Sequence, residues 1–76
     1  MAAKGLLRAL GEELRARRKE KNWSQELLAE KAKLHRNFIG FLERGQRNPT
    51  LETISELASA LKISISELIS GAEKRL

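Results

Sequence analysis

Apolar residues recur at intervals of three and four residues in several segments of the chain, and this is the period of an α-helix. One such face lies near the N-terminus and consists of Leu6, Leu7, Leu10 and Leu14. Another lies in the second half and consists of Leu51, Ile54, Leu57, Ala58 and Leu61. Along the whole chain the pattern predicts five helices, at about residues 6–21, 25–32, 35–44, 51–61 and 65–70. The short connections leave no room for strands, so we expect one all-α domain over residues 1–76.

The predicted helix boundaries coincide with residues that begin helices. Ser24 and Thr50 are suited to accept a hydrogen bond from a free amide at the start of the second and fourth helices. Ser64 has a glutamate three residues later, which is the spacing of a capping box and predicts the start of the last helix. We expect the last helix to end before Gly71 and the tail of residues 72–76 to fray.

The third predicted helix has two faces of different chemistry. Ile39 and Leu42 are three residues apart and are predicted to face the core. The opposite face consists of Arg36, Asn37, Gly40, Phe41 and Arg44. Arginine can pair with guanine, asparagine with adenine, and an aromatic ring can pack on the thymine methyl group. This face therefore predicts a DNA-reading surface, with Arg36, Asn37 and Phe41 as base contacts. Gly40 has no side chain and would allow the helix to approach the DNA groove closely.

Each of these residues also has an ordinary structural explanation. The two arginines can simply solvate an exposed face, and Asn37 can complete the first helical turn. Phe41 can pack on a neighbouring helix or on a partner subunit. Their joint placement on one helical face favours DNA over these alternatives.

The positive charge is concentrated in one part of the chain. The net charge is +5, but residues 1–47 contain twelve Lys/Arg against six Asp/Glu, whereas residues 48–76 contain three against four. Such an asymmetry indicates an anionic partner that is engaged from one side, most often nucleic acid. Charge alone is equally compatible with a small basic protein that uses it only to stay in solution.

Composition and motifs argue against several other classes of protein. The chain has no cysteine and one histidine, so neither disulfides nor a metal site is expected. No apolar run approaches the roughly 20 residues of a membrane span and no signal peptide is evident, so we expect a cytoplasmic location without a membrane partner. No catalytic pair of carboxylates, activated nucleophile or phosphate-binding glycine loop is present. We therefore expect no enzymatic activity, no cofactor and no small-molecule ligand.

The ordered segments LGEELRARR, SQELLAEKA, LERG, NPTLETISELASALKIS and SELI resemble the Cro/C1-type (XRE) family of bacterial and phage helix-turn-helix regulators. The likeness extends from about Leu10 to Ile69. The segment HRNFIGFLERGQRN is also similar to controller proteins of restriction–modification systems. The resemblance implies a compact five-helix, lambda-repressor-like domain that acts at the bacterial or phage nucleoid and places its third helix in the major groove of operator DNA.

The resemblance also implies roles for individual residues. It places base contacts at Arg36, Asn37 and Phe41. It implies an ion pair between Arg18 and Glu43, and a cation is expected there on physical grounds because an unpaired carboxylate at the core margin would cost several kcal/mol. Contacts to the DNA backbone are implied for Ser24, Gln25, His35, Arg44, Gln46, Arg47 and Asn48.

The chain departs from the family pattern in two turns. Lys33 and Lys62 occupy positions where the family usually has a glycine in left-handed conformation. That conformation costs a non-glycine residue roughly 1 kcal/mol or more. We therefore expect the turn between the second and third helices to differ from the family pattern at Lys33, or to be strained there.

A homodimer is expected, because one helix-turn-helix supplies few base contacts and a two-fold dimer doubles them. Ile65, Leu68 and Ile69 offer more apolar surface than a short final helix buries alone and are the candidates for the dimer interface. The alternative is that Ile65 and Leu68 simply cover the core, and for Leu68 this is the favoured interpretation. The sequence thus predicts a sequence-specific transcriptional regulator that binds double-stranded DNA as a dimer. The alternative is a protein-interaction module of antitoxin or antirepressor type, in which Phe38 and Phe41 meet a partner protein.

Overall fold

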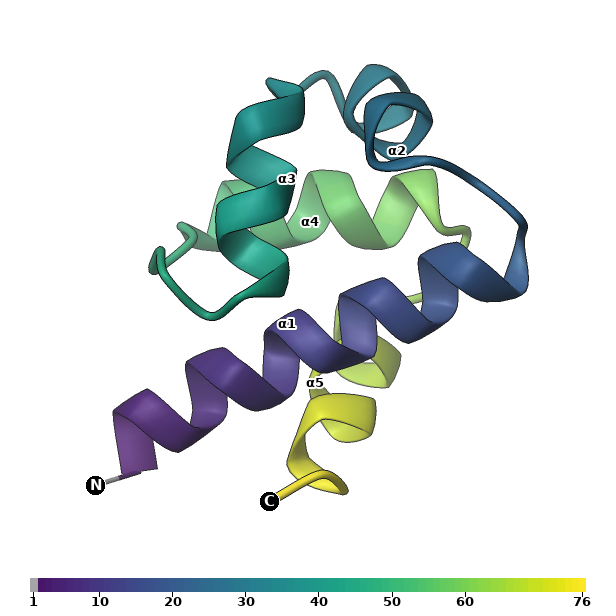
Figure 1. Ribbon diagram of the computed structural model, residues 1–76. Coiled ribbons are helices and arrows are strands. Elements are labelled where there is room, and N and C mark those ends of the chain that lie inside the picture. Colours follow the sequence, from purple (N-terminus) through teal and green to yellow (C-terminus); the bar gives the residue numbers. More distant parts are fainter. Residues whose placement is uncertain (1) are drawn as a thin grey trace.

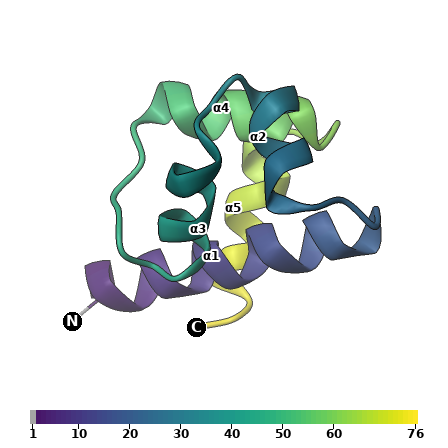
Figure 2. The same cartoon turned by 45° about the horizontal axis from the view of Figure 1, so that its top comes forward.

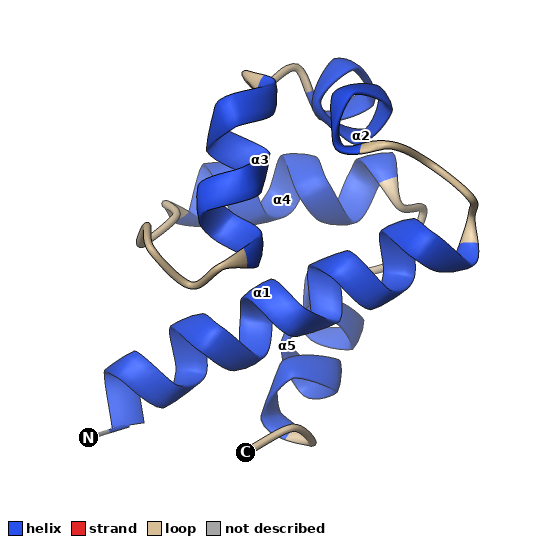
Figure 3. Ribbon diagram, in the orientation of Figure 1, coloured by secondary structure: helices blue, strands red, loops and turns tan. Residues whose placement is uncertain are grey.

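The computed structural model describes residues 2–76, which form five α-helices and no strand within that range (Figures 1 and 3). The helices are α1 (Ala2–Glu20), α2 (Gln25–Ala32), α3 (Arg36–Glu43), α4 (Leu51–Ala60) and α5 (Ile65–Glu73). The all-α prediction is confirmed, but α1 begins before the predicted residue 6 and α5 continues beyond the predicted residue 70. Within residues 2–76, no helix combines the length and hydropathy that a membrane span requires.

The long helix α1 is the base on which the other helices are arranged. Both α3 and α5 pack against α1, while α2 packs against α3 and α4, and α4 also contacts α5 (Figures 1 and 2). The short turn between α2 and α3 places these two helices together at one side of the molecule (Figure 1). This pair has the topology of a helix-turn-helix.

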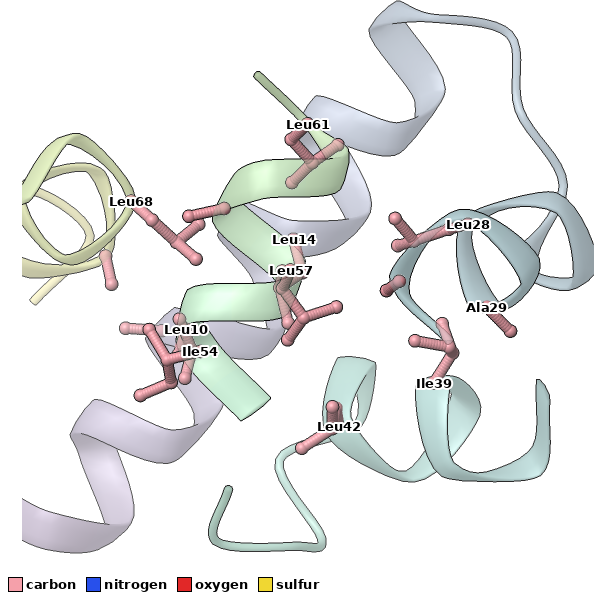
Figure 4. Packing of buried hydrophobic residues seen from close by; sticks show 14 residues of the cluster. Leu10, Leu14, Leu28, Ala29, Ile39, Leu42, Ile54, Leu57, Leu61 and Leu68 are labelled. Atoms are coloured by element: carbon pink, nitrogen blue, oxygen red, sulfur yellow. The ribbon is translucent and has the colours of Figure 1, made fainter. Parts of the chain in front are cut away.

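The hydrophobic core lies where the five helices meet (Figure 4). Its largest side chains are at most 2% exposed and belong to Leu14, Leu28, Ile39, Leu57, Leu61 and Leu68. The apolar pattern was wrong at two positions, because Leu6 is 37% exposed and Leu51 is 75% exposed. Leu51 is the first residue of α4 and directly follows the N-cap Thr50. Periodicity therefore identified the buried faces but not how far along each helix they extend.

Side-chain caps fix the start of three helices, as predicted. The hydroxyl oxygens of Ser24 and Thr50 accept hydrogen bonds from the amides three residues later, at 3.0 Å and 3.1 Å. Ser64 and Glu67 form the complete capping box, with each side chain bonded to the other residue's backbone amide. These bonds satisfy amides that have no partner within the helix.

The turns after α2 and α4 keep the glycine-type geometry although lysine occupies both. Lys33 and Lys62 have φ of 60° and 59°. The amides of Leu34 and Ile63 then donate to the carbonyl five residues earlier, at 2.8 Å and 3.0 Å, as in a Schellman motif. Leu34 and Ile63 also pack against the core, so the apolar contact that accompanies this motif is present as well. The expected difference in the turn is therefore limited to local strain at the lysine.

The helix α5 continues through Gly71 because it packs closely on α1 there. A Cβ atom at Gly71 would overlap the carboxylate of Glu13, so the glycine permits close approach and does not end the helix. Glu13 is buried and accepts hydrogen bonds from Arg17 at 2.6 Å and Arg75 at 2.9 Å. Ala72 is fully buried. The predicted end of the helix before Gly71 is therefore wrong, and Ala72 and Glu73 of the predicted tail belong to α5.

The Glu13 carboxylate makes the α1–α5 contact sensitive to acid. Burial acts to raise the pKa of Glu13, but the hydrogen bonds and charges of Arg75 and Arg17 outweigh it, so the pKa lies below its ordinary value of 4.5. A carboxylate with a lowered pKa stabilises the fold fully above pH 4.5, and this stabilisation is lost as pH falls through the folded-state pKa. We expect Glu13→Gln to destabilise the protein near neutral pH, and its difference from wild type to shrink as pH falls below 4.5.

Urea unfolding at a series of pH values from about 6 down to about 3 measures this difference. Glu12→Gln is the matched control, since Glu12 is the exposed neighbour on the same helix. A Glu13→Gln curve that stays parallel to wild type over this range would contradict the assignment.

Candidate nucleic-acid interface

The first turn of α3 projects two polar side chains into solvent. His35 is the N-cap of α3, and its Nδ1 accepts a hydrogen bond from the amide of Asn37 at 3.1 Å. Arg36 and Asn37 follow directly and are exposed. The cap thus holds the start of α3 so that Arg36 and Asn37, two of the three predicted base contacts, point away from the core.

The N-terminal half of α2 and the outer face of α3 enclose a concavity of about 650 Å³. Six of the predicted contact residues line it: Ser24, Gln25, Arg36, Asn37, Phe41 and Arg44. Arg18, Glu26 and Gly40 line it as well. The remaining predicted backbone contacts do not line the concavity but are exposed: His35, Gln46, Arg47 and Asn48. The structure therefore gathers six of the ten predicted contact residues around one concavity.

A buried ion pair lies beneath this surface and joins α1 to α3. Arg18 donates from Nε to Oε2 of Glu43 at 2.7 Å and from a second guanidinium nitrogen to Oε1 at 3.0 Å. Both residues are only 8% exposed. Arg18 also donates to the carbonyl of Trp23 at 2.8 Å, and Gln25 donates from its amide to Oε1 of Glu43 at 3.0 Å. The network connects α1, the following loop, α2 and α3, and it fixes the side chain of Gln25 at the edge of the concavity.

Two glycines control how closely neighbouring groups approach α3. A Cβ atom at Gly11 would meet the backbone carbonyls of Leu42 and Glu43, so the last turn of α3 lies directly on the backbone of α1. Gly40 was predicted to belong to the exposed face, but it is buried. A Cβ at Gly40 would lie 3.3 Å from the Arg44 guanidinium and 3.6 Å from the Gln25 amide oxygen. Gly40 therefore leaves room for these two side chains.

Arg36 has an acidic partner that the sequence analysis missed. Its guanidinium lies 3.3 Å from the carboxylate of Glu26 on α2. The two side chains are 63% and 71% exposed. Such an exposed pair stabilises by at most about 1 kcal/mol, so it orients Arg36 without holding it permanently.

Phe41 is half-buried between two arginines on the outer face of α3. The guanidinium carbons of Arg44 and Arg47 lie 5.2 Å and 4.3 Å from its ring centroid.

Phe38 also differs from a freely exposed aromatic, because it is partly buried and packs against the core. Of the two aromatic residues that an interaction module would use, Phe38 is therefore largely committed to the fold.

The residues predicted for a dimer interface have different environments. Leu68 is completely buried within the subunit. Its assignment to the interface is therefore wrong, because the side chain already fills the core beneath α5. Ile69 is half-buried against the core, and Ile65 is 39% exposed. Only Ile65 and part of Ile69 remain available on α5.

Comparison with known proteins places the chain among helix-turn-helix proteins. The Helix-turn-helix family model matches residues 14–68, which include α2, α3 and α4 entirely. The chain is 48% identical over 60 residues to the control protein C.SmaI of Serratia marcescens, over 79% of this chain and 71% of that protein.

Solved structures show the same relationship. The restriction-modification controller protein C.AhdI from Aeromonas hydrophila superposes with a TM-score of 0.80 at 47% identity, over 82% of this chain and 94% of that chain. The clp gene regulator ClgR from C. glutamicum superposes with a TM-score of 0.86 at 29% identity, over 91% and 88% of the two chains.

The buried network predicts an unequal response to single and paired substitutions. Glu43→Leu leaves the Arg18 charge buried without its partner and should lower the free energy of unfolding by about 3 to 5 kcal/mol. The double variant Arg18→Met/Glu43→Leu removes both charges and should be clearly more stable than Glu43→Leu alone. Denaturant unfolding of wild type, Arg18→Met, Glu43→Leu and the double variant forms a double-mutant cycle. Additive effects would show that the two side chains do not stabilise each other.

Proposed function

Since the chain belongs to the helix-turn-helix family and is a DNA-binding transcriptional regulator, we propose that it binds operator DNA as a two-fold dimer with α3 in the major groove. The observation that supports this most directly is the exposure of Arg36 and Asn37 together on the first turn of α3, at the rim of the concavity. A helix with its side chains is about 10–12 Å wide and matches the major groove, which is about 12 Å wide.

Arg36 and Asn37 are proposed to read base edges. A bidentate arginine–guanine contact discriminates between bases by about 1 to 3 kcal/mol. This exceeds the value of at most about 1 kcal/mol for the exposed Arg36–Glu26 pair, so Arg36 can exchange its carboxylate for a guanine. In the free protein, Glu26 keeps the Arg36 guanidinium near the position in which it would contact a guanine.

The residues around Arg36 and Asn37 are proposed to bind the phosphates of the DNA backbone. On one side lie Ser24, Gln25 and His35, at the starts of α2 and α3. On the other side the backbone contacts are Arg44, Gln46, Arg47 and Asn48. Lysine and arginine outnumber acidic residues two to one in residues 1–47, which favours a polyanion on this part of the chain.

The dimensions of one subunit agree with the proposed dimer. The described chain measures 32 × 22 × 22 Å. Half-sites one helical turn apart are about 34 Å from centre to centre, so two subunits that touch can place their α3 helices in successive major grooves. Ile65 and Ile69 on α5 are the proposed contact, and Leu51 at 75% exposure is a further apolar side chain that such a surface could cover.

Substitution of the two classes of arginine should separate base reading from backbone binding. On a site selected from random duplex DNA, Arg36→Ala should cost about 1 to 3 kcal/mol and relax the preference at one base pair. Arg47→Ala should weaken binding to all sequences alike and reduce the slope of log affinity against log salt by about 1. Titrations by fluorescence anisotropy at several salt concentrations measure both effects.

Equal losses from Arg36→Ala on every duplex would remove Arg36 from the base contacts. Binding of the wild-type protein that does not weaken as salt rises would contradict DNA binding through phosphates and favour a protein partner at the same surface.

Replacement of Ile65 by glutamate should disrupt the proposed dimer. Full burial of an isoleucine contributes about 1.5 to 3 kcal/mol, so covering its exposed part in both subunits of a two-fold interface contributes about 2 kcal/mol. We expect Ile65→Glu to weaken dimerisation at least about 30-fold, as measured by sedimentation equilibrium. Leu6→Glu is the matched control, because Leu6 is exposed to a similar extent, 37% against 39%, but lies on α1. Dissociation by Leu6→Glu and not by Ile65→Glu would place the interface elsewhere.

A further inference from the structure

The ring of Phe41 is occupied by two guanidinium groups in the free protein. Arg44 and Arg47 lie 5.2 Å and 4.3 Å from its centroid, both within the range of a cation–π interaction. We propose that Phe41 is a positioning residue, whose ring holds Arg44 and Arg47 ready for an anion, and that it does not read a thymine methyl group. The identification of this anion as the DNA backbone rests on the function proposed above.

Neighbouring groups hold the same two arginines from other sides. Arg44 donates from Nε to the side-chain oxygen of Gln46 at 3.1 Å, and Arg47 donates to the backbone carbonyl of Gln46 at 3.2 Å. Gly40 has no side chain, which leaves the space that the Arg44 guanidinium fills. Each guanidinium is thus held both by the ring of Phe41 and by Gln46.

The shared partner of Arg44 and Arg47 is an aromatic ring and not a carboxylate. Four other arginines, Arg17, Arg18, Arg36 and Arg75, form salt bridges with carboxylates. Among the residues that the structure describes, no carboxylate forms a salt bridge with Arg44 or Arg47. An aromatic face attracts a cation without carrying a formal negative charge. The ring can therefore orient two cations while leaving their charge available to a phosphate.

Orientation before binding has a measurable effect on affinity. Fixing a flexible side chain costs free energy when it happens only on binding, and a contact that already holds the side chain removes part of that cost. For two arginines, each with a cation–π contact of ordinary strength at the surface, loss of the ring should weaken binding about tenfold.

The test compares Phe41→Leu with Phe41→Tyr. Leucine keeps an apolar group that can still touch a methyl group but cannot orient a cation, whereas tyrosine keeps the ring. We expect Phe41→Leu to bind all duplexes about tenfold more weakly, with a salt slope close to that of wild type because both arginines are still present, and Phe41→Tyr to stay close to wild type. Thermal unfolding of both variants verifies that the fold is intact.

Duplexes in which uracil replaces thymine test the alternative role directly, because uracil lacks only the methyl group. The matched variant here is Phe41→Ser, which has neither the ring nor an apolar side chain that could touch a methyl group. If Phe41 positions the arginines, the wild-type protein and Phe41→Ser should lose the same small factor on uracil DNA. A loss on uracil DNA that is present in wild type and absent in Phe41→Ser would overturn the proposal. So would a Phe41→Leu protein that binds every duplex with the wild-type affinity.

A measurement without DNA separates this proposal from the proposed function. In the free protein, the ring current of Phe41 should shift the side-chain protons of Arg44 and Arg47 in NMR spectra, and Phe41→Leu should abolish these shifts. Their absence in wild type would overturn the positioning role even if DNA binding holds. Their presence in a protein that binds no duplex would leave the arginine cluster intact and refute DNA as its partner.

Discussion

The position of α3 depends above all on the buried ion pair between Arg18 and Glu43. Two charges that are each 8% exposed are costly to remove from water, and only good geometry with further hydrogen bonds offsets that cost. Here the pairing is bidentate, Trp23 and Gln25 complete the network, and no buried side-chain polar atom lacks a partner among the residues described. Because the network spans α1, α2 and α3, these helices cannot shift independently without breaking it.

The backbone supports the same arrangement at two further points. Gly11 lets the end of α3 lie directly on α1, where any side chain would collide with the carbonyls of Leu42 and Glu43. The left-handed conformation at Lys33 closes the turn between α2 and α3 through the bond from Leu34 to Ala29 at 2.8 Å. A rigid support on each side of α3 suits the base-reading role that is proposed for this helix.

The arginines of the helix-turn-helix are held in three different ways, and each way matches a different task. Arg18 is locked in a buried carboxylate pair and serves the fold. Arg36 is held loosely by the exposed Glu26, from which a stronger partner can take it. Arg44 and Arg47 rest against the ring of Phe41 and keep their charge unneutralised. The proposed division into structural, base-reading and phosphate-binding cations thus follows from the nature of their partners.

By itself the sequence determined the helical class, the helix starts at Ser24, Thr50 and Ser64, and the buried faces, because these depend on local capping and on a period of 3.6 residues. Resemblance to a known family added the proposed contacts to the DNA backbone and the Arg18–Glu43 pair, and the structure contains that pair. Tertiary structure alone decided what lies between helices: the exposure of Leu51, the burial of Leu68, the continuation of α5 through Gly71 over Glu13, and the arginines around Phe41. These features depend on which atoms of distant segments meet, and neither periodicity nor composition contains that information.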